Sequence, residues 1–478
     1  MSSYDIIIIG GGVTGAAIAR ELSRYKLSIA LIEKEEELAF GVSKSNSGII
    51  HPGTQNSPDS LKGRLCVEGN RLTRVLSKEL GVAFKEVGEL IVAFSEEDIS
   101  RLVELKEDAE KLGVPGTRIV KKNWLKKNEP NLSSEAIAAL YAPTAGIISP
   151  YRWVYDLSEN AAKNGVEIHT GTKVENIALL DAGGFEIHTA RGVFVSRFII
   201  NAAGLFADDI SKMVGISDFT IHPRKGEEFI LDKKRQYLTK HLLFPLPSKK
   251  SKGILVTRTS DGNPMIGPTA EEVTDKEDLS TTDEGFKKVL TSARKLVPSI
   301  DEDDIIAYFA GVRPAAGDDF IIRHEERAPG FVNAAGIQSP GLTASPAIAR
   351  MVVRILEKNG LRMKRKIVFH GHRKKTTHLF EIPFSKTRKL IKKDPGYGDV
   401  VCRCEMVSAK EIKDAIKRGA KTMDGIKFRT RAQAGRCHGG FCTTRLMKIL
   451  SEELKTSLTE VTKRGKGSEI VKKDRKSD

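Results

Sequence analysis

The first thirty-four residues combine two apolar runs with one helical pattern. YDIIIIGGG (4–12) predicts a buried strand, because four consecutive isoleucines bounded by glycines fit a strand that is covered on both faces. TGAAIARELSRY (14–25) predicts a helix, and LSIALIEK (27–34) predicts a second buried strand ending at Glu33. The order of strand, glycine turn, helix, strand and acid predicts the start of an α/β domain.

Similar patterns return later in the chain. RFIINAAGLFADDI (197–210), IIAYFAG (305–311) and GFVNAAGIQSPGLTASPAIA (330–349) each place glycines or polar residues directly after an apolar strand pattern. IARMVVRILEKNG (348–360) then predicts a helix. The alternation in LVTRTSDGN (255–263) predicts one more strand.

The glycines after the first strand form a nucleotide-binding fingerprint. Gly10, Gly12 and Gly15 match the G-x-G-x-x-G spacing, which lets a backbone approach a pyrophosphate at a helix N-terminus. Glu33 follows the second strand and can accept hydrogen bonds from ribose hydroxyls. The alternative is a glycine-rich turn within an ordinary α/β fold. The fingerprint alone does not separate FAD from NAD, but the related patterns far along the chain favour the longer FAD molecule.

Length and charge limit the class of protein. A chain of 478 residues predicts two or three domains, and the absence of an apolar run of about eighteen residues argues against a membrane-spanning helix. Asp5 precedes the first apolar run where a signal peptide would be basic, so we expect a cytoplasmic protein. Of the net charge of +16, residues 362–393 contribute twelve Lys and Arg against one acid.

The basic segments allow several interpretations. The simplest is a solvated linker and tail; the alternative is a surface that docks an acidic protein or anionic lipid at the inner face of the membrane. Nucleic acid is not expected as a partner, because no known reading motif accompanies the charge.

Four of the five cysteines lie together near the C-terminus. Cys402 and Cys404 are separated by one residue, and Cys437 and Cys442 by four. Cytosolic thiols stay reduced, so the cluster favours a metal centre over disulfides. Structural zinc sites usually pair cysteines two to four residues apart, which fits the first pair poorly without excluding zinc, whereas four thiolates suit a [2Fe–2S] cluster.

The first domain resembles the FAD-dependent D-amino-acid-oxidase-like superfamily, within it the branch of glycerol-3-phosphate dehydrogenases and oxidases, with L-2-hydroxyglutarate dehydrogenases nearby. The segments that carry this resemblance are GVSKSNSGIIHPG (41–53), SLKGRLCVEGN (60–70), HPRKGEEFILDK (222–233), GILVTRTSDGNPMIGPTA (253–270), AGVRPAAGDDFII (310–322) and GIQSPGLTASPA (336–347).

The C-terminal segment resembles the [2Fe–2S] domain of bacterioferritin-associated ferredoxins, with Cys402, Cys404, Cys437 and Cys442 as its ligands. Within it, VSAKEIKDAIKRG (407–419) predicts a short capped helix.

The two resemblances imply an α/β (α+β) protein. We expect a Rossmann-like FAD-binding lobe interleaved with an antiparallel-sheet substrate lobe, together spanning residues 1–360. A basic linker over 361–396, an iron–sulfur domain over 397–455 and a basic, disordered tail over 456–478 complete the prediction.

The resemblance also implies which residues act on the substrate. His51 follows the segment expected beneath the flavin, and a neutral imidazole there suits removal of the hydroxyl proton. Arg313 is expected beside the substrate, where it could clamp an anion, and Arg258 is the second candidate cation. Lys225 is a weaker candidate, and Cys66 is expected to be a small core residue on an amphipathic helix.

Many segments are implied to bind the FAD. The expected residues are Gly10, Gly12, Val13, Thr14, Gly15, Glu33, Lys34, Ser43, Ser45, Asn46, Ser47, Val174, Ala203, Gly204, Gly311, Arg313, Gly336, Gln338, Ser339, Gly341, Leu342 and Thr343.

A flavin joined to a one-electron cluster implies electron transfer to a partner protein. The expected reaction is oxidation of glycerol 3-phosphate, a small anionic substrate, to dihydroxyacetone phosphate. One alternative is the oxidation of L-2-hydroxyglutarate or of a secondary amine such as proline or sarcosine. The other is an electron-transfer subunit, within a heteromer, that has no substrate of its own.

Overall fold

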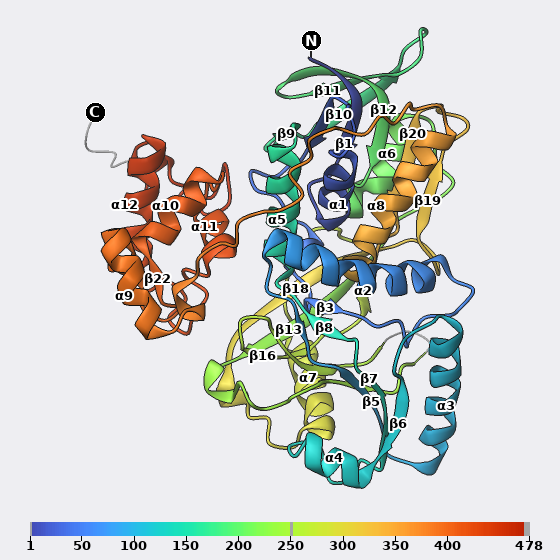
Figure 1. Cartoon of the computed structure of the whole chain (residues 1–478), viewed down its shortest axis with the longest axis vertical. Helices are drawn as coiled ribbons and strands as arrows, with labels where there is room; N and C mark the ends of the chain where they lie inside the picture. The colour runs from blue at the N-terminus through green and yellow to red at the C-terminus, as the bar shows by residue number, and fades with distance from the viewer. Residues whose placement is uncertain (1, 249–251, 473–478) are drawn as a thin grey trace. The chain divides into compact units, whose positions relative to one another are not determined.

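The computed structural model describes residues 2–248 and 252–472, and the chain forms two compact units (Figure 1). The first unit contains Met1–Ile32, Ala39–Ile168 and Val174–Arg373. The second contains Glu33–Leu38, His169–Lys173 and Lys374–Asp478. No helix in the described parts of the chain is long and apolar enough to cross a membrane.

An eight-stranded sheet carries the nucleotide-binding pattern. Its strands, in spatial order, are β10 (Val174–Leu179), β11 (Phe185–Thr189), β12 (Gly192–Asn201), β1 (Ser2–Ile9), β2 (Ile29–Ile32) and β9 (Val166–His169), with β20 (Phe331–Ala335) between β12 and β19 (Ile321–His324). β1 runs parallel to both β2 and β12, and β12 runs parallel to β20. Parallel central strands with both faces covered explain why Ile6–Ile9 are all apolar and buried.

Helices cover this sheet. α1 (Val13–Leu22) packs against α5 (Pro150–Lys163) and α8 (Gly341–Lys358), while α2 (Leu61–Leu80) packs on α8 (Figure 1). α6 (Ala207–Met213) follows β12. The helix and both strands predicted for the first thirty-four residues are therefore present.

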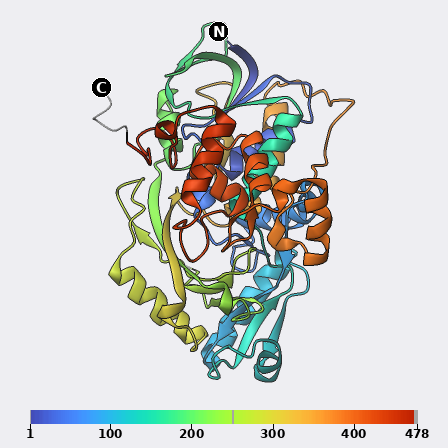
Figure 2. The ribbon, with the colours of Figure 1, turned by 90° about the vertical axis from the view of Figure 1, so that its left-hand side faces the viewer.

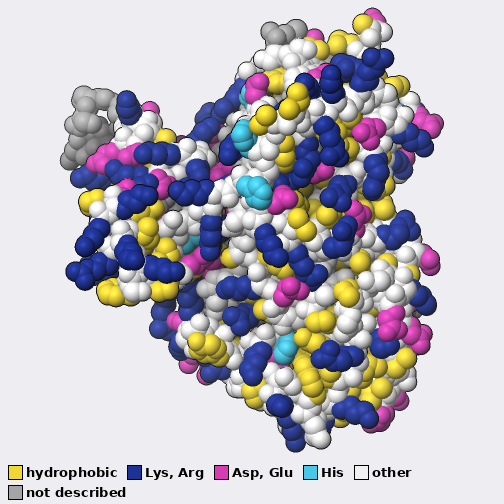
Figure 3. Space-filling view, in the orientation of Figure 1, with side chains coloured by type: hydrophobic (Ala, Val, Ile, Leu, Met, Phe, Trp, Pro, Cys, Tyr) yellow, Lys and Arg dark blue, Asp and Glu magenta, His cyan; other side chains and the backbone are white. Residues whose placement is uncertain are grey.

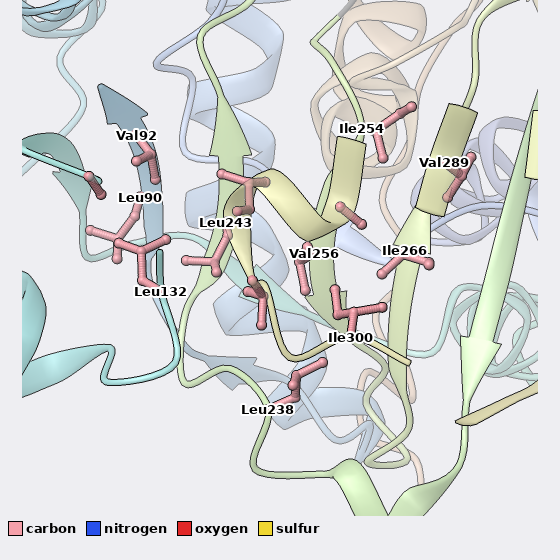
Figure 4. Close-up of a cluster of buried hydrophobic side chains, with 14 of the residues drawn as sticks. Leu90, Val92, Leu132, Leu238, Leu243, Ile254, Val256, Ile266, Val289 and Ile300 are labelled. Carbon is pink, nitrogen blue, oxygen red and sulfur yellow. The ribbon is translucent and has the colours of Figure 1, made fainter. Parts of the chain in front are cut away.

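A nine-stranded, largely antiparallel sheet forms the second lobe of the first unit. Its strands are β17 (Glu271–Glu272), β13 (His222–Leu231), β16 (Pro264–Gly267), β15 (Leu255–Arg258), β14 (Leu242–Pro245), β5 (Glu89–Ala93), β7 (Ala138–Ala142) and β6 (Arg118–Lys121), with β18 (Ile305–Ala315) paired to β13. α3 (Glu96–Lys111) packs on β5 and β7, α4 (Lys122–Asn128) on β6, and α7 (Asp283–Leu296) on β16. Apolar side chains such as Leu243, Val256 and Ile266 fill the core of this lobe (Figure 4).

The two lobes of the first unit are interleaved along the chain. A three-stranded sheet of β3 (Ile49–Ile50), β8 (Gly146–Ile147) and β4 (Lys85–Glu86) and the short helices η1 (Val42–Lys44), η2 (Gly204–Phe206), η3 (Lys233–Arg235) and η4 (Glu302–Asp304) complete the unit. Because β13–β18 are inserted between β12 and β19, the chain leaves the parallel sheet and later returns to it. This confirms the predicted fold class.

The second unit is mainly helical. It contains η5 (Leu379–Glu381), α9 (Phe384–Lys393), η6 (Pro395–Tyr397), β21 (Val400–Cys402), β22 (Val407–Ser408), α10 (Ala409–Lys417), α11 (Met423–Thr430), α12 (Thr443–Leu454) and η7 (Leu458–Glu460). α10 packs against α11 and α12, as the orange and red helices of Figure 2 show. Cys402 and Cys442 lie within its apolar core.

Two stretches differ from the simple linker and tail that the charge pattern predicts. Within 361–396 the chain forms η5 and α9, and α9 has no buried residue. Within 456–472 it forms η7 and a bridge between Thr462 and Glu469. Single apolar residues in these stretches, including Leu379 and Val461, are buried. The net charge of the two stretches gives no sign of this burial. Residues 473–478 lie outside the described residues.

Candidate active site and iron–sulfur centre

The glycine turn between β1 and α1 leaves no room for side chains. Gly10 has φ +112°, and a Cβ there would lie 2.3 Å from the carbonyl oxygen of Ala202. A Cβ on Gly15 would lie 2.0 Å from the oxygen of Gly10. The N-cap of α1 is Gly12, which has no side chain to cap the helix. The first amides of α1 are therefore available to an anion, except that of Val13, which donates to Ser43 Oγ at 2.9 Å. The turn fits the pyrophosphate of a dinucleotide.

Three of the expected cofactor segments meet one another. The amide of His51 donates to Thr343 Oγ1 at 2.9 Å, joining the segment after β3 to the start of α8. A Cβ on Gly311 would lie 2.2 Å from the carbonyl oxygen of Ser45, so β18 passes directly against the segment that follows η1. Asn46 fixes this segment by donating from Nδ2 to the carbonyl oxygen of Val42 at 3.1 Å.

His51 is buried and electrically neutral. Its carbonyl oxygen accepts a hydrogen bond from Asn70 Nδ2 at 3.0 Å, and its ring lies edge-on to Phe244 with 6.0 Å between centroids. Burial, and then the nearby ammonium of Lys252, lower the pKa of His51 well below its usual value. A neutral imidazole can accept a proton at pH 7, which is what a general base requires.

Arg313 is half-buried and lies near the buried carboxylate of Glu228. Its Nη2 donates to the carbonyl oxygen of Thr269 at 2.5 Å. Glu228 interacts electrostatically with the guanidinium, and one oxygen of this carboxylate accepts a hydrogen bond from Ser47 Oγ. Burial lowers the pKa of Arg313 and raises that of Glu228 to about 7, although Ser47 and Arg313 both act in the opposite direction on Glu228.

Lys252 and Glu89 form a second buried group of opposite charges. Glu89 begins β5 with no exposed surface; one oxygen accepts from Thr54 Oγ1, and Oε2 has no hydrogen-bond partner among the described residues. Lys252 Nζ is also buried and unpartnered in the described part of the chain. Burial raises the pKa of Glu89 to about 7 and lowers that of Lys252, while the two charges partly offset these shifts.

Arg258 ends β15 and is half-buried, opposite Pro264 of β16. Its Nε is buried and has no hydrogen-bond partner among the described residues. The described contacts do not join it to His51 or Arg313, so its role stays a prediction. Lys225 Nζ pairs with Asp278 at 2.7 Å, and this ion pair gives the lysine a structural role.

Four thiols of the second unit form two pairs. Cys404 and Cys437 have their sulfur atoms 3.5 Å apart at the surface, whereas Cys402 and Cys442 are buried and adjacent. Within the described residues, no three or more His, Cys, Asp or Glu side chains are arranged to hold a metal ion. Two separate pairs suit a cluster that has two thiolates on each of two irons better than a single tetrahedral ion.

Hydrogen bonds prepare these sulfurs for ligation. Contact with Cys442 lowers the pKa of Cys402 to about 6, and the contact raises that of Cys442. The backbone amide of Gln433 donates to Cys402, and those of Gly439 and Phe441 donate to Cys437. Amides that point at sulfur stabilise the thiolate form, which is the form that binds iron.

Comparison with known proteins agrees with this geometry. Residues 5–355 match the family model for FAD dependent oxidoreductases, and residues 400–452 match the model for BFD-like [2Fe-2S] binding domains. The chain belongs to the FAD dependent oxidoreductase family. This FAD-dependent oxidoreductase therefore carries a [2Fe–2S] domain behind its flavin domain.

Relatives of the oxidoreductase match one or both domains. A glycerol 3-phosphate dehydrogenase of Caloramator mitchellensis is 41% identical over 99% of both chains. A glycerol 3-phosphate oxidase of Mycoplasma pneumoniae is 35% identical over 74% of this chain and 95% of its own. The solved structure of FAD-bound L-alpha-glycerophosphate oxidase from Mycoplasma pneumoniae aligns with a TM-score of 0.75 at 33% identity, over 78% of this chain and 98% of that one.

The remaining expected FAD residues occupy loops at strand ends of the oxidoreductase. Ala203 and Gly204 follow β12, and Gly336 (φ +65°) and Gln338 follow β20, where the amide of Gly341 donates to the carbonyl oxygen of Gln338 at 2.6 Å. Ser339 lies in the loop before α8, Leu342 is the second residue of α8, and Val174 begins β10. That each of them contacts FAD stays a prediction.

Glu33 and Lys34 belong to a stretch of the second unit of the oxidoreductase. Glu33 follows β2 directly, and its Oε1 accepts the amide of Glu35 at 2.9 Å. Their contact with FAD also stays a prediction.

Sequence reasoning overlooked Lys252, Glu89 and the role of Glu228. Lys252 lies in the run KKSKG, which has the appearance of a solvated basic loop. A signal was present for Glu89, because GELIVAF places one acid at the start of an otherwise apolar strand. Glu228 lies in GEEF, where nothing distinguishes it from its neighbour Glu227.

Proposed function

We propose that this protein oxidises the C2 hydroxyl of sn-glycerol 3-phosphate to dihydroxyacetone phosphate and passes the electrons onward through its [2Fe–2S] domain. The observation that carries the proposal is the glycerol 3-phosphate dehydrogenase that is 41% identical over 99% of both chains, and so over both domains. Bound FAD supplies the two-electron acceptor for the carbon-bound hydride.

His51 is the proposed general base. Its buried imidazole is neutral, so it can take the proton of the C2 hydroxyl as the carbon is oxidised. The backbone amide of His51 donates a hydrogen bond to Thr343, and its carbonyl oxygen accepts one from Asn70, so the backbone that carries the ring is fixed on both sides. These bonds support a fixed imidazole position, which proton transfer over one hydrogen bond requires.

Buried cations are proposed to hold the phosphate. Lys252 Nζ and Arg258 Nε are buried without partners among the described residues, and such groups are costly unless a ligand pairs with them. Arg313 is proposed to stabilise negative charge near the reacting oxygen. Glu33, Gly10, Gly12 and the other predicted contacts are proposed to bind FAD.

Anaerobic titration of the flavin tests the proposed function. We expect the flavin absorbance of the purified protein to disappear on addition of sn-glycerol 3-phosphate but not of glycerol, which lacks the phosphate. Bleaching by L-2-hydroxyglutarate, proline or sarcosine instead would show that the proposed substrate is wrong, while the assignment as a dehydrogenase would stand. No bleaching by any of them would favour an electron-transfer subunit.

Variants test the phosphate site separately. Lys252→Ala and Arg258→Ala should each raise KM by about 10- to 100-fold with a smaller change in kcat, since a charge-assisted hydrogen bond contributes about 1.5–3 kcal/mol. Lys106→Ala on the surface of α3, paired only with Glu110 in the described contacts, is the control. An unchanged KM would remove the substituted residue from the site.

A further inference from the structure

The cysteines of the second unit differ sharply in exposure. Cys402 and Cys442 are 1% and 2% exposed, whereas Cys404 is exposed and Cys437 is partly exposed. A cluster bound by both pairs would therefore have one edge in the interior of this unit and the other, at Cys404 and Cys437, at its surface. Electron transfer between proteins needs such an exposed edge, because the transfer rate falls steeply with distance.

Two large apolar side chains flank this exposed edge. Met406, two residues after Cys404, is 49% exposed, and Phe441, four residues after Cys437, is 86% exposed. The backbone holds Met406 in the left-handed region at φ +50°, and the amide of Phe441 donates to Cys437, so both positions are fixed relative to the sulfurs. Exposed apolar groups beside a functional centre are typical of protein contacts.

The exposed charged side chains next to Cys404 and Cys437 in the sequence are basic. Arg403 and Arg436 are exposed on the two cysteine-bearing loops. No acidic residue occurs from 432 to 450, and Glu405 is buried and bound to Arg431 at 2.7 Å. On the visible face of this unit, Lys and Arg side chains lie among hydrophobic ones, with some acidic side chains as well (Figure 3). A partner that fits this edge would present acidic residues around an apolar centre.

We propose that Met406, Phe441, Arg403 and Arg436 form the docking edge for a small acidic one-electron carrier protein, which takes electrons from the cluster side of Cys404 and Cys437. The proposal rests on the proposed function as a dehydrogenase. Oxidation of one substrate molecule releases two electrons and two protons. Two oxidised carrier molecules take one electron each, and the protons pass to solvent.

Charge reversal in the full-length holoenzyme tests the docking edge. With an acidic flavodoxin as the probe, Arg403→Glu combined with Arg436→Glu should lower the second-order rate of carrier reduction at low salt by tenfold or more. The rate with wild-type protein should fall as salt rises, and the double variant should lose most of this dependence. Lys392→Glu combined with Lys393→Glu, on the exposed face of α9, is the matched control and should change the rate little.

Truncation tests the apolar centre. Phe441→Ala should weaken carrier binding about tenfold, as expected for a central interface aromatic residue. Phe384→Ala, which removes an equally exposed ring from α9, should not weaken it. Iron content and the visible circular dichroism of the cluster must match wild type, which separates lost docking from lost cluster.

Three outcomes would overturn the proposal. Carrier reduction that neither the Arg variants nor Phe441→Ala slow would show that the carrier docks elsewhere. Slower cluster reduction by substrate, with unchanged carrier binding, would assign this edge to exchange with the flavin domain. Loss of co-sedimentation with anionic vesicles, without loss of carrier binding, would assign it to a membrane. Failure of the proposed function is distinguishable, because it appears as flavin that glycerol 3-phosphate does not bleach in any variant.

Discussion

At the scale of single residues, His51 combines burial with neutrality. A structural histidine in a core would show the same burial, so the distinguishing feature is the buried Lys252 ammonium, which acts electrostatically on its ring. Because its pKa is lowered, the imidazole stays unprotonated through the physiological range, as a general base must be before the reaction.

Replacing His51 by Ala should therefore slow flavin reduction by glycerol 3-phosphate by about 10²–10⁴-fold, the usual loss for one general base. FAD content should stay the same, because His51 contributes only its backbone to the described cofactor segments. Stopped-flow reduction under nitrogen measures this rate. A wild-type rate between pH 6 and pH 9 would assign proton removal to another group.

Glu89 makes stability depend on pH. Its pKa is raised from 4.5 to about 7 by burial, so the folded state holds a proton that the unfolded chain releases between these values. The stability from this group is complete below pH 4.5 and is lost as pH rises through 7, by about 3 kcal/mol.

Replacing Glu89 by Gln should flatten the fall in thermal midpoint between pH 5 and pH 8, because the amide does not ionise. Calorimetry of the holoenzyme at several pH values measures the slope. Glu228 has a similarly raised pKa, so part of the wild-type slope should remain. Equal slopes in the variant and wild type would show that Glu89 does not titrate in this range.

At the scale of elements, α10 shows how local sequence positions the cluster. Ser408 accepts the amide of Glu411 at 3.3 Å, and Glu411 accepts the amide of Ser408 at 2.9 Å, which forms a buried capping box. Ser408 also ends β22, which pairs with β21 and its Cys402. The cap therefore connects a helix end to a ligand-bearing strand.

Ser408→Ala should destabilise the iron–sulfur unit by about 1 kcal/mol, the usual cost of a lost cap. The visible absorbance of the cluster should disappear at a lower temperature than in wild type, while flavin release should not move. Ser95→Ala removes an equivalent capping box from α3 in the other unit and is the control. If both variants lowered the temperature at which the cluster absorbance disappears by the same amount, the effect of Ser408 would not be local.

At the scale of the whole molecule, the two units divide the chemistry. The first contains the buried His51 and the cations of the proposed substrate site, and the second contains all four clustered thiols. Substrate oxidation and onward transfer should therefore be separable by substitution in one unit.

Replacing Cys402 by Ser should remove the iron and the electron paramagnetic resonance signal of the reduced cluster. Flavin bleaching by substrate should persist, but turnover with a one-electron protein acceptor should fail. Cys66→Ala, which changes a buried thiol outside the cluster, should retain iron. If metal analysis of protein purified without oxygen gave one zinc and no iron, the [2Fe–2S] assignment would be wrong.

Local pattern determined much of this protein. Four isoleucines before Gly10 predict β1 from local sequence alone, because a run of apolar β-branched residues that ends at a glycine turn strongly favours a buried strand. The fingerprint likewise specified the glycine turn between β1 and α1, whereas the four cysteine ligands were implied by the family resemblance, not by their spacing, and stay a prediction. α10 was predictable for the same reason, since its cap and apolar face lie within thirteen residues.

Only the tertiary structure decided which charges are buried together. Lys252 lies 163 residues from Glu89, and Glu228 lies 181 residues from Ser47, so no local pattern pairs them. The pKa of each group depends on desolvation and on neighbours brought close by folding, neither of which a sequence states. The tertiary structure also decided that Cys402 is buried and Cys404, two residues later, is exposed. Cys402 belongs to the core that α10 and α12 form, and Cys404 does not.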